Sequence, residues 1–272
     1  MAEEKLVLKP GVVAPFLSGI AMSDDGENFL FTELDMSEKH IEQLNKTIDE
    51  AKEVWTCNLS GNNIKDPGAL QTMANVIHLD LRGNKINNLS IFTNEELFLN
   101  LKWLDVGFNA FKEFPAFKLP KLEYLDVSSN KLEKINEGWQ GHQQLKILKA
   151  GDNKFKNMNL FKGMPKLEEL YAPMNAIITL GGYADLGALK KLHLRGNKIE
   201  NIAGGGDDGV ELPELPALTY LNLRSNQIKD MDSAFKLFAY ASLKDLNLIN
   251  NPCELAFSSM NMMVGRMLIK AG

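Results

Sequence analysis

The sequence is poor in cysteine, in long apolar runs and in positive charge. Its 272 residues include two cysteines, Cys57 and Cys253, which are too few for a disulfide framework. No apolar run approaches the length of about 18 residues that suggests a transmembrane helix. Residues 11–20 form the longest apolar stretch, but Pro15 interrupts it and no basic signal-peptide region precedes it. We therefore expect a cytoplasmic protein that has reduced thiols and no membrane partner.

Net positive charge is also missing. The formal net charge of -5 argues against a chain-wide surface for nucleic acid, and nucleic acid is not expected as a partner. Residues 1–50 contain four lysines and eleven acidic residues, whereas the rest of the chain contains 26 basic and 24 acidic residues. The acidity therefore belongs to the N-terminal segment, and the body of the chain is nearly neutral.

The residue patterns of catalysis and metal binding are absent as well. The four histidines form no metal-spaced pair with each other or with a cysteine. The sequence contains no Gly-x-Ser-x-Gly, no phosphate-binding loop and no dinucleotide fingerprint. We therefore predict no enzymatic activity, no cofactor, no metal and no small-molecule substrate. Asp80, Asp105 and Asp126 resemble an acid cluster, but the simpler interpretation is a solvated stripe on one face of a sheet.

A repeat dominates the rest of the sequence. Nine times, an asparagine follows apolar residues at minus 8, minus 5 and minus 3 and precedes another at plus 2, as in residues 76–86, VIHLDLRGNKI. This is the leucine-rich-repeat pattern L-x-x-L-x-L-x-x-N-x-L, with spacings of 21 to 29 residues. The asparagines that mark it are Asn62, Asn84, Asn109, Asn130, Asn153, Asn175, Asn197, Asn226 and Asn251.

The repeat predicts an α/β leucine-rich-repeat solenoid. Each L-x-L pair is a short strand, neighbouring strands pair in parallel on the concave face, and the return limbs form short helical or 3-10 turns on the convex face. Each asparagine turns inward to satisfy backbone groups of its own turn and of the next repeat. We expect an N-terminal arm over residues 1–28, one degenerate and nine regular repeats over 29–253, and a capping helix over 254–272. Lys39 replaces the asparagine in the degenerate copy.

Register places the other strand side chains in columns on the concave face. Aromatic and apolar residues fill its centre, acids occupy early strands and basic residues occupy late ones. Such a surface suits a protein interface, because aromatics and arginine are the usual hot-spot types. The alternative is a solvated face whose aromatics only stabilise cross-strand contacts. The candidate protein-binding residues are Asp80, Trp103, Asp105, Tyr124, Asp126, Tyr171, Lys191, His193, Arg195, Tyr220 and Arg224.

The 22-residue form of the repeat resembles the subfamily of the nuclear regulatory subunit of protein phosphatase 1, which also includes a spliceosomal protein and axonemal proteins. Residues 220–254, YLNLRSNQIKDMDSAFKLFAYASLKDLNLINNPCE, look like the leucine-rich-repeat protein of the axonemal radial spoke. This resemblance implies a non-enzymatic scaffold that binds other proteins of a larger complex in a cilium or flagellum axoneme. A regulatory phosphatase subunit and a ribonucleoprotein-associated adaptor are the alternatives.

Overall fold

Two compact units make up the protein. One contains Met1–Lys131 and Ile135–Trp139, and the other contains Leu132–Lys134 and Gln140–Gly272. A computed structural model describes residues 6–23, 25–158, 161–182, 185–200, 202, 212, 214–229 and 234–253, and the backbone of 267–268. In these ranges no helix is both long and apolar enough to cross a membrane.

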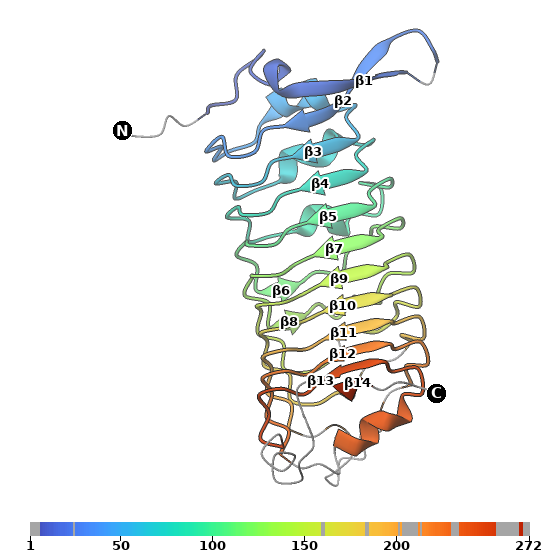
Figure 1. The fold of residues 1–272 in the computed structure, drawn as a ribbon. Helices are drawn as coiled ribbons and strands as arrows, with labels where there is room; N and C mark the ends of the chain where they lie inside the picture. Colours follow the sequence, from blue (N-terminus) through green and yellow to red (C-terminus); the bar gives the residue numbers. More distant parts are fainter. Residues whose placement is uncertain are drawn as a thin grey trace. The chain divides into compact units, whose positions relative to one another are not determined.

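The first unit is a stack of short strands (Figure 1). They are β1 (Leu17–Met22), β2 (Phe29–Asp35), β3 (Thr56–Asn58), β4 (His78–Asp80), β5 (Trp103–Asp105) and β7 (Tyr124–Asp126). β1 pairs with β2 antiparallel, and every later pair is parallel. The parallel pairs keep the same register, because Leu34 faces Cys57, then Leu79, Leu104 and Leu125. Equal register places equivalent residues of each repeat in columns.

The second unit repeats this arrangement. Its parallel strands are β9 (Ile147–Lys149), β10 (Glu169–Tyr171), β11 (Lys191–His193), β12 (Tyr220–Asn222) and β13 (Asp245–Asn247). β14 (Met267–Leu268) pairs with β13 antiparallel. The prediction of a helix over 254–272 is wrong at these two residues, since their backbone extends the sheet instead. The rest of that predicted helix lies outside the described residues.

Most of the short 3-10 helices lie in return limbs. η1 (Ala14–Phe16) precedes β1, and the others are η2 (Lys46–Ala51), η3 (Gly68–Thr72), η4 (Ser90–Thr93) and η5 (Lys236–Ala239). Within the described residues, two stretches of the limbs form short strands instead, β6 (Glu113–Phe114) and β8 (Lys134–Ile135). Limbs without a helix still bury their apolar residues, for example Ile177 and Leu180. The short apolar period therefore reports burial more faithfully than it reports helix.

The core lies between strands and return limbs. The central strand residues Leu34, Leu79, Leu104 and Leu125 are at most 1% exposed, as are their counterparts Leu148, Leu170, Leu192 and Leu221 in the second unit. Cys57 takes one of these positions, and both cysteines are buried without forming a disulfide. The predicted burial of both thiols in the core is confirmed.

An asparagine ladder joins neighbouring repeats. Asn84 illustrates it: its Nδ2 donates to the carbonyls of Leu59 and Leu81, both at 3.0 Å. Its Oδ1 accepts the amide of Ile64 at 3.0 Å. Leu59 and Ile64 belong to the preceding repeat, so the expectation that each asparagine serves the next repeat is wrong. The side-chain amide of Asn84 bonds to the preceding repeat because the turn that carries Asn84 lies beside the end of the preceding strand.

A left-handed residue precedes every ladder asparagine. The φ angles at these positions lie between 52° and 71°. Glycine adopts such angles without strain, but six of the nine positions carry a residue other than glycine. The nine residues are Gly61, Gly83, Phe108, Ser129, Asp152, Met174, Gly196, Ser225 and Asn250. The hydrogen bonds of the following asparagine offset the backbone strain at the non-glycine positions.

The degenerate repeat has no ladder asparagine of its own, but the asparagine of the next repeat bonds to its turn. Asn62 accepts the amides of Lys39 and Ile41, each at 3.0 Å, and donates to the carbonyl of Met36 at 2.9 Å. Lys39 occupies the asparagine position, and the preceding residue Glu38 also has a positive φ of 55°. An asparagine at Lys39 would serve an earlier parallel repeat, whereas the strand on that side is the antiparallel β1.

We predict that Asn84→Ala destabilises the protein by roughly 2–4 kcal/mol. The substitution leaves the buried Ile64 amide without its partner, which costs about 1–3 kcal/mol. It also removes one of the two side-chain bonds that each of the Leu59 and Leu81 carbonyls accepts. Urea unfolding followed by circular dichroism measures the change. Asn87→Ala, at an exposed asparagine in the same repeat, is the matched control and should change the free energy of unfolding by less than about 0.5 kcal/mol. Equal effects of the two substitutions would refute the role of the ladder.

Candidate functional site

The open face of the first unit carries a stacked aromatic pair. Register puts Trp103 beside Tyr124, and their rings stack with centroids 5.0 Å apart and planes 9° apart. His78 adjoins Trp103 on the other side at 6.5 Å. Both stacked side chains are half-buried, so one ring edge of the pair still meets solvent. Such a pair offers a flat, rigid apolar contact at low entropic cost.

A column of acids lies next to this pair. Asp80, Asp105 and Asp126 are register partners on successive strands. The prediction that they are solvated is wrong, because Asp105 and Asp126 are only 5% and 8% exposed. Their Oδ1 atoms accept the backbone amides of Gly107 and Ser128, both at 2.8 Å, and Asp80 accepts that of Arg82 at 2.9 Å. Each carboxylate closes the turn that follows its strand.

Burial raises the pKa of two of these carboxyl groups, Asp80 and Asp105. Desolvation raises the pKa of Asp105 to about 7, against the opposing bond from Gly107, and the neighbouring carboxyls add to the rise. Desolvation also raises the pKa of Asp80. The column therefore carries less negative charge near neutral pH than the residue types suggest, and a nearby cation would increase that charge.

Aromatic and histidine rings line the open face of the second unit. Tyr171 lies 6.0 Å from His193, which lies 6.5 Å from Tyr220. The Tyr171 hydroxyl donates to Glu169 at 2.6 Å, and the Lys191 ammonium donates to the same carboxylate at 2.8 Å. Burial, followed by the charge of Arg195, lowers the pKa of His193, so this ring is neutral at pH 7.

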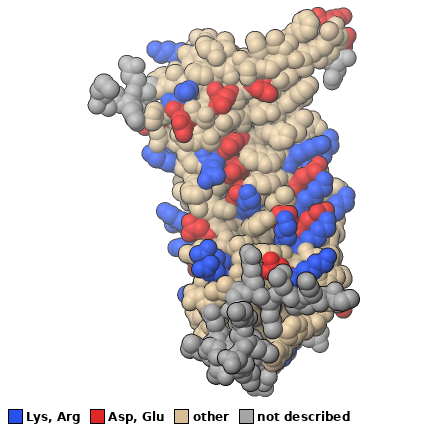
Figure 2. All heavy atoms as spheres, in the orientation of Figure 1, with Lys and Arg blue, Asp and Glu red and all other residues tan. Residues whose placement is uncertain are grey.

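Charge on this face is more balanced than the sequence predicts. Lys191 pairs with Glu169 at 2.8 Å, and the adjacent Lys190 pairs with Glu168 at 2.8 Å. Figure 2 shows acidic and basic side chains interleaved on the surface. Arg195 and Arg224 are both exposed, and among the described residues neither forms an ion pair, unlike Lys191.

Sequence reasoning missed one exposed pair. The Arg82 guanidinium lies 4.5 Å from the centre of the Phe108 ring, a cation–π contact. Phe108 is 51% exposed and holds the left-handed position before Asn109. An aromatic residue where a repeat favours glycine is the signal that could have marked it.

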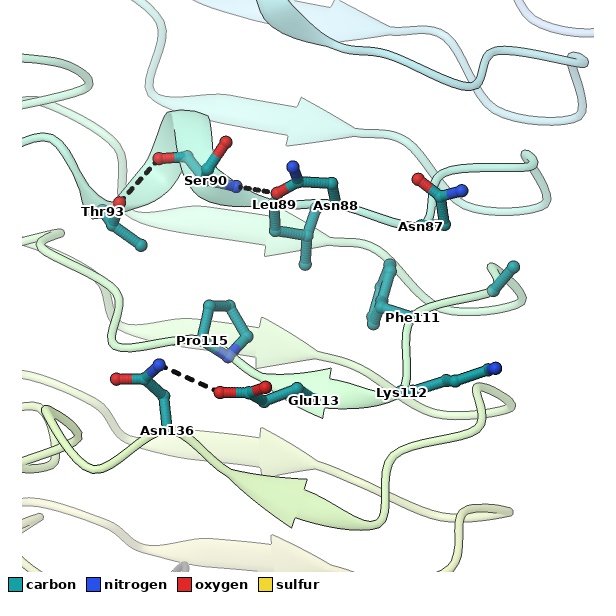
Figure 3. A pocket seen from close by; sticks show the side chains of 11 residues that line it. Asn87, Asn88, Leu89, Ser90, Thr93, Phe111, Lys112, Glu113, Pro115 and Asn136 are labelled. Carbon is teal, nitrogen blue, oxygen red and sulfur yellow. Dashed lines mark hydrogen bonds between the residues drawn. The ribbon is translucent and has the colours of Figure 1, made fainter.

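A groove runs along the return limbs of the first unit, away from the predicted site. Figure 3 shows that several of its polar groups are bonded within the chain: Asn136 donates to Glu113 at 2.9 Å, and the hydroxyl of Thr93 donates to the Ser90 carbonyl at 2.7 Å. In the part of the chain that the structure describes, no three His, Cys, Asp or Glu side chains gather as metal ligands. The open faces of the parallel strands in each unit therefore remain the candidate binding surfaces.

Comparison with protein families accounts for the repeats. One leucine-rich-repeat model matches residues 120–177, and a second matches residues 58–70 and 215–230. The chain is built of leucine-rich repeats. The matched segments carry both the stacked strands and the ladder asparagines Asn62, Asn130, Asn153, Asn175 and Asn226.

Two curated relatives share the name leucine-rich repeat-containing protein 23. The protein from Bos taurus is 28% identical over 72% of this chain, and that from Homo sapiens is 26% identical over the same share. The chain spans about half of their length, 54% in each case. At these identities the likeness supports a leucine-rich-repeat scaffold.

Solved structures agree on the fold. A chain of the LRIM1/APL1C complex superposes with a TM-score of 0.64 at 19% identity, covering 82% of this chain and 40% of that one. The leucine-rich-repeat domain of APL1 gives 0.62 at 24%, covering 78% of this chain and 53% of that one. The predicted α/β leucine-rich-repeat solenoid is confirmed.

Asp105 predicts a pH dependence of stability. Its pKa is raised from the ordinary value near 4 to about 7 in the folded state, so the folded protein holds a proton that the unfolded chain releases. Stability should therefore fall as pH rises from about 4 to about 7. Asp105→Asn keeps an oxygen for the Gly107 amide but cannot ionise. We expect it to raise the free energy of unfolding by about 1–2 kcal/mol at pH 8 and to change it little at pH 4.

Urea titrations of both proteins at several pH values measure this difference. Asp152→Asn is the control, because Asp152 is an exposed aspartate at the turn of another repeat. Parallel stability curves for wild type and Asp105→Asn would show that Asp105 ionises normally.

Proposed function

We propose that this chain is a non-enzymatic scaffold whose open sheet faces bind other proteins. The observation that carries the proposal is the Trp103–Tyr124 stack, half-exposed beside the acid column. Stacked aromatics in the middle of a surface with polar edges are the usual anchors of protein interfaces. Leucine-rich-repeat solenoids commonly bind protein partners on such faces.

The second unit supplies the polar part of the proposed site. Tyr171, His193 and Tyr220 give a row of rings, and two exposed arginines lie close to it in the chain. Arg195 is two residues after His193, and Arg224 is four residues after Tyr220. Lys191 is already compensated by Glu169. This composition favours a protein segment with acidic and aromatic residues over nucleic acid, since few cations are left for phosphates.

We further propose that the protein works in a ciliary or flagellar axoneme, in a radial spoke. Support comes from residues 220–254, which resemble the radial-spoke repeat protein, and the likeness to leucine-rich repeat-containing protein 23 is compatible with this. The 22-residue repeat type is part of the same proposal. A phosphatase-regulatory subunit and a ribonucleoprotein adaptor share that repeat, so the partners decide between them.

We predict that Trp103→Ala with Tyr124→Ala weakens partner binding by at least about 2 kcal/mol, roughly thirtyfold. The rings are half-buried on the surface, so the fold should persist. Affinity isolation of the tagged chain from axonemes, followed by titration of the recovered partner, measures the loss. Phe235→Ala with Phe238→Ala is the matched control, because it removes a stacked exposed pair, 5.8 Å apart, from η5 instead of the sheet.

Three results of that experiment would contradict the proposal. Undiminished binding by the double variant would refute the open-face site. Recovery of a phosphatase catalytic subunit would replace the axonemal role with a regulatory one. Recovery from nuclear extract with ribonucleoprotein components would favour the adaptor.

A further inference from the structure

The N-terminal hairpin exposes four large apolar side chains. Ile20 and Met22 on β1 are 71% and 56% exposed, and Phe29 and Phe31 on β2 are 74% and 48% exposed. Antiparallel register pairs Ile20 with Phe31 and Met22 with Phe29, so all four share one face of the hairpin. Clusters of exposed apolar residues mark interaction sites more often than isolated ones do.

The same hairpin ends the sheet. β1 is the terminal strand next to β2, so its outer N–H and C=O groups have no strand beside them in the described structure. Natural edge strands are usually protected by charged residues or proline, yet Leu17–Met22 has neither. An unprotected edge with apolar neighbours is a template for strand addition.

Acidic residues surround this apolar face. Alternation along β2 places Glu33 and Asp35 on the same face as Phe29 and Phe31, and Asp25 and Glu27 lie in the turn of the hairpin. The tip of the hairpin is marked by acidic atoms in Figure 2. Residues 1–50 carry eleven acids against four lysines. A second copy of this chain would bring like charge to like charge, which disfavours self-association at this edge.

We propose that the hairpin binds an extended segment of a protein partner, which adds to the free edge of β1. The segment places apolar residues at alternate positions, where they contact Ile20 and Met22, and carries lysine or arginine on the same face at its two ends. One end lies beside Ser18, the register partner of Glu33, and the other lies beside the turn that holds Asp25 and Glu27. Main-chain hydrogen bonds supply affinity, and the alternating side chains supply specificity. This surface is separate from the Trp103–Tyr124 stack, so either one can fail without the other.

A labelled peptide, Lys-Thr-Val-Thr-Ile-Thr-Val-Thr-Lys, whose apolar residues and terminal lysines share one face when extended, serves as the probe for the whole chain in fluorescence anisotropy. Wild type should bind it, and Ile20→Ser with Met22→Ser should bind at least about tenfold more weakly without a change in charge. The matched control is Ile178→Ser with Met174→Ser, which removes an exposed isoleucine and methionine elsewhere, at 57% and 59% exposure, and should bind like wild type. Circular dichroism verifies that every variant folds.

Two further peptides test the chemistry. Replacing the central isoleucine with proline should abolish binding, because proline cannot complete the strand ladder. Replacing the lysines with glutamates should weaken binding at least about tenfold through repulsion. Equal binding of the lysine and glutamate peptides, or an unchanged affinity of the hairpin variant, overturns the proposal. A wild-type dimer in sedimentation that the hairpin variant loses would assign the edge to a second copy and overturn it as well.

Discussion

The bond from each ladder asparagine to the preceding repeat is the interaction on which the sheets depend. Short three-residue strands supply few hydrogen bonds of their own, and the turn after each strand would leave buried amides and carbonyls unpaired. A single side chain with two donors and an acceptor satisfies both its own turn and its neighbour's, as Asn84 does for Leu81, Leu59 and Ile64. Equal register, and hence the surface columns, follows from that repeated fit.

The surface columns show how the same scaffold gives one residue type different roles. Asp105 is almost completely buried and closes a turn, whereas the stacked Trp103 two residues earlier remains half-exposed. Within this strand, Asp105 therefore contributes to stability, and Trp103 is available to a partner. The raised pKa of Asp105 connects the two, since a cationic group that docks beside the aromatics would favour its ionised form.

Much of this was accessible from the sequence, because a nine-fold pattern fixes which residues are central in each strand. The core leucines and the columns need only the period. The direction of the ladder, by contrast, depends on the path of the turn, and the left-handed residues are hidden because Phe108 and Met174 replace glycine. The burial of Asp105 depends on its neighbours' backbones, and the exposure of Phe29 depends on β2 being longer than β3. No local residue pattern encodes this burial of Asp105 or this exposure of Phe29.

The backward direction of the ladder gives the stack a polarity. The turn of each repeat that has a following repeat is hydrogen-bonded by the asparagine of that following repeat. The first repeat can therefore lack its own asparagine, as Lys39 shows, while its turn keeps its hydrogen bonds. Removing whole repeats from the N-terminal side would leave the turns of the remaining repeats hydrogen-bonded. Removing them from the C-terminal side would take away the asparagine that bonds the turn of the new last repeat. Duplication of a repeat is consequently easiest in the interior. There the copied repeat has a preceding turn for its asparagine to bond and a following asparagine that bonds its own turn.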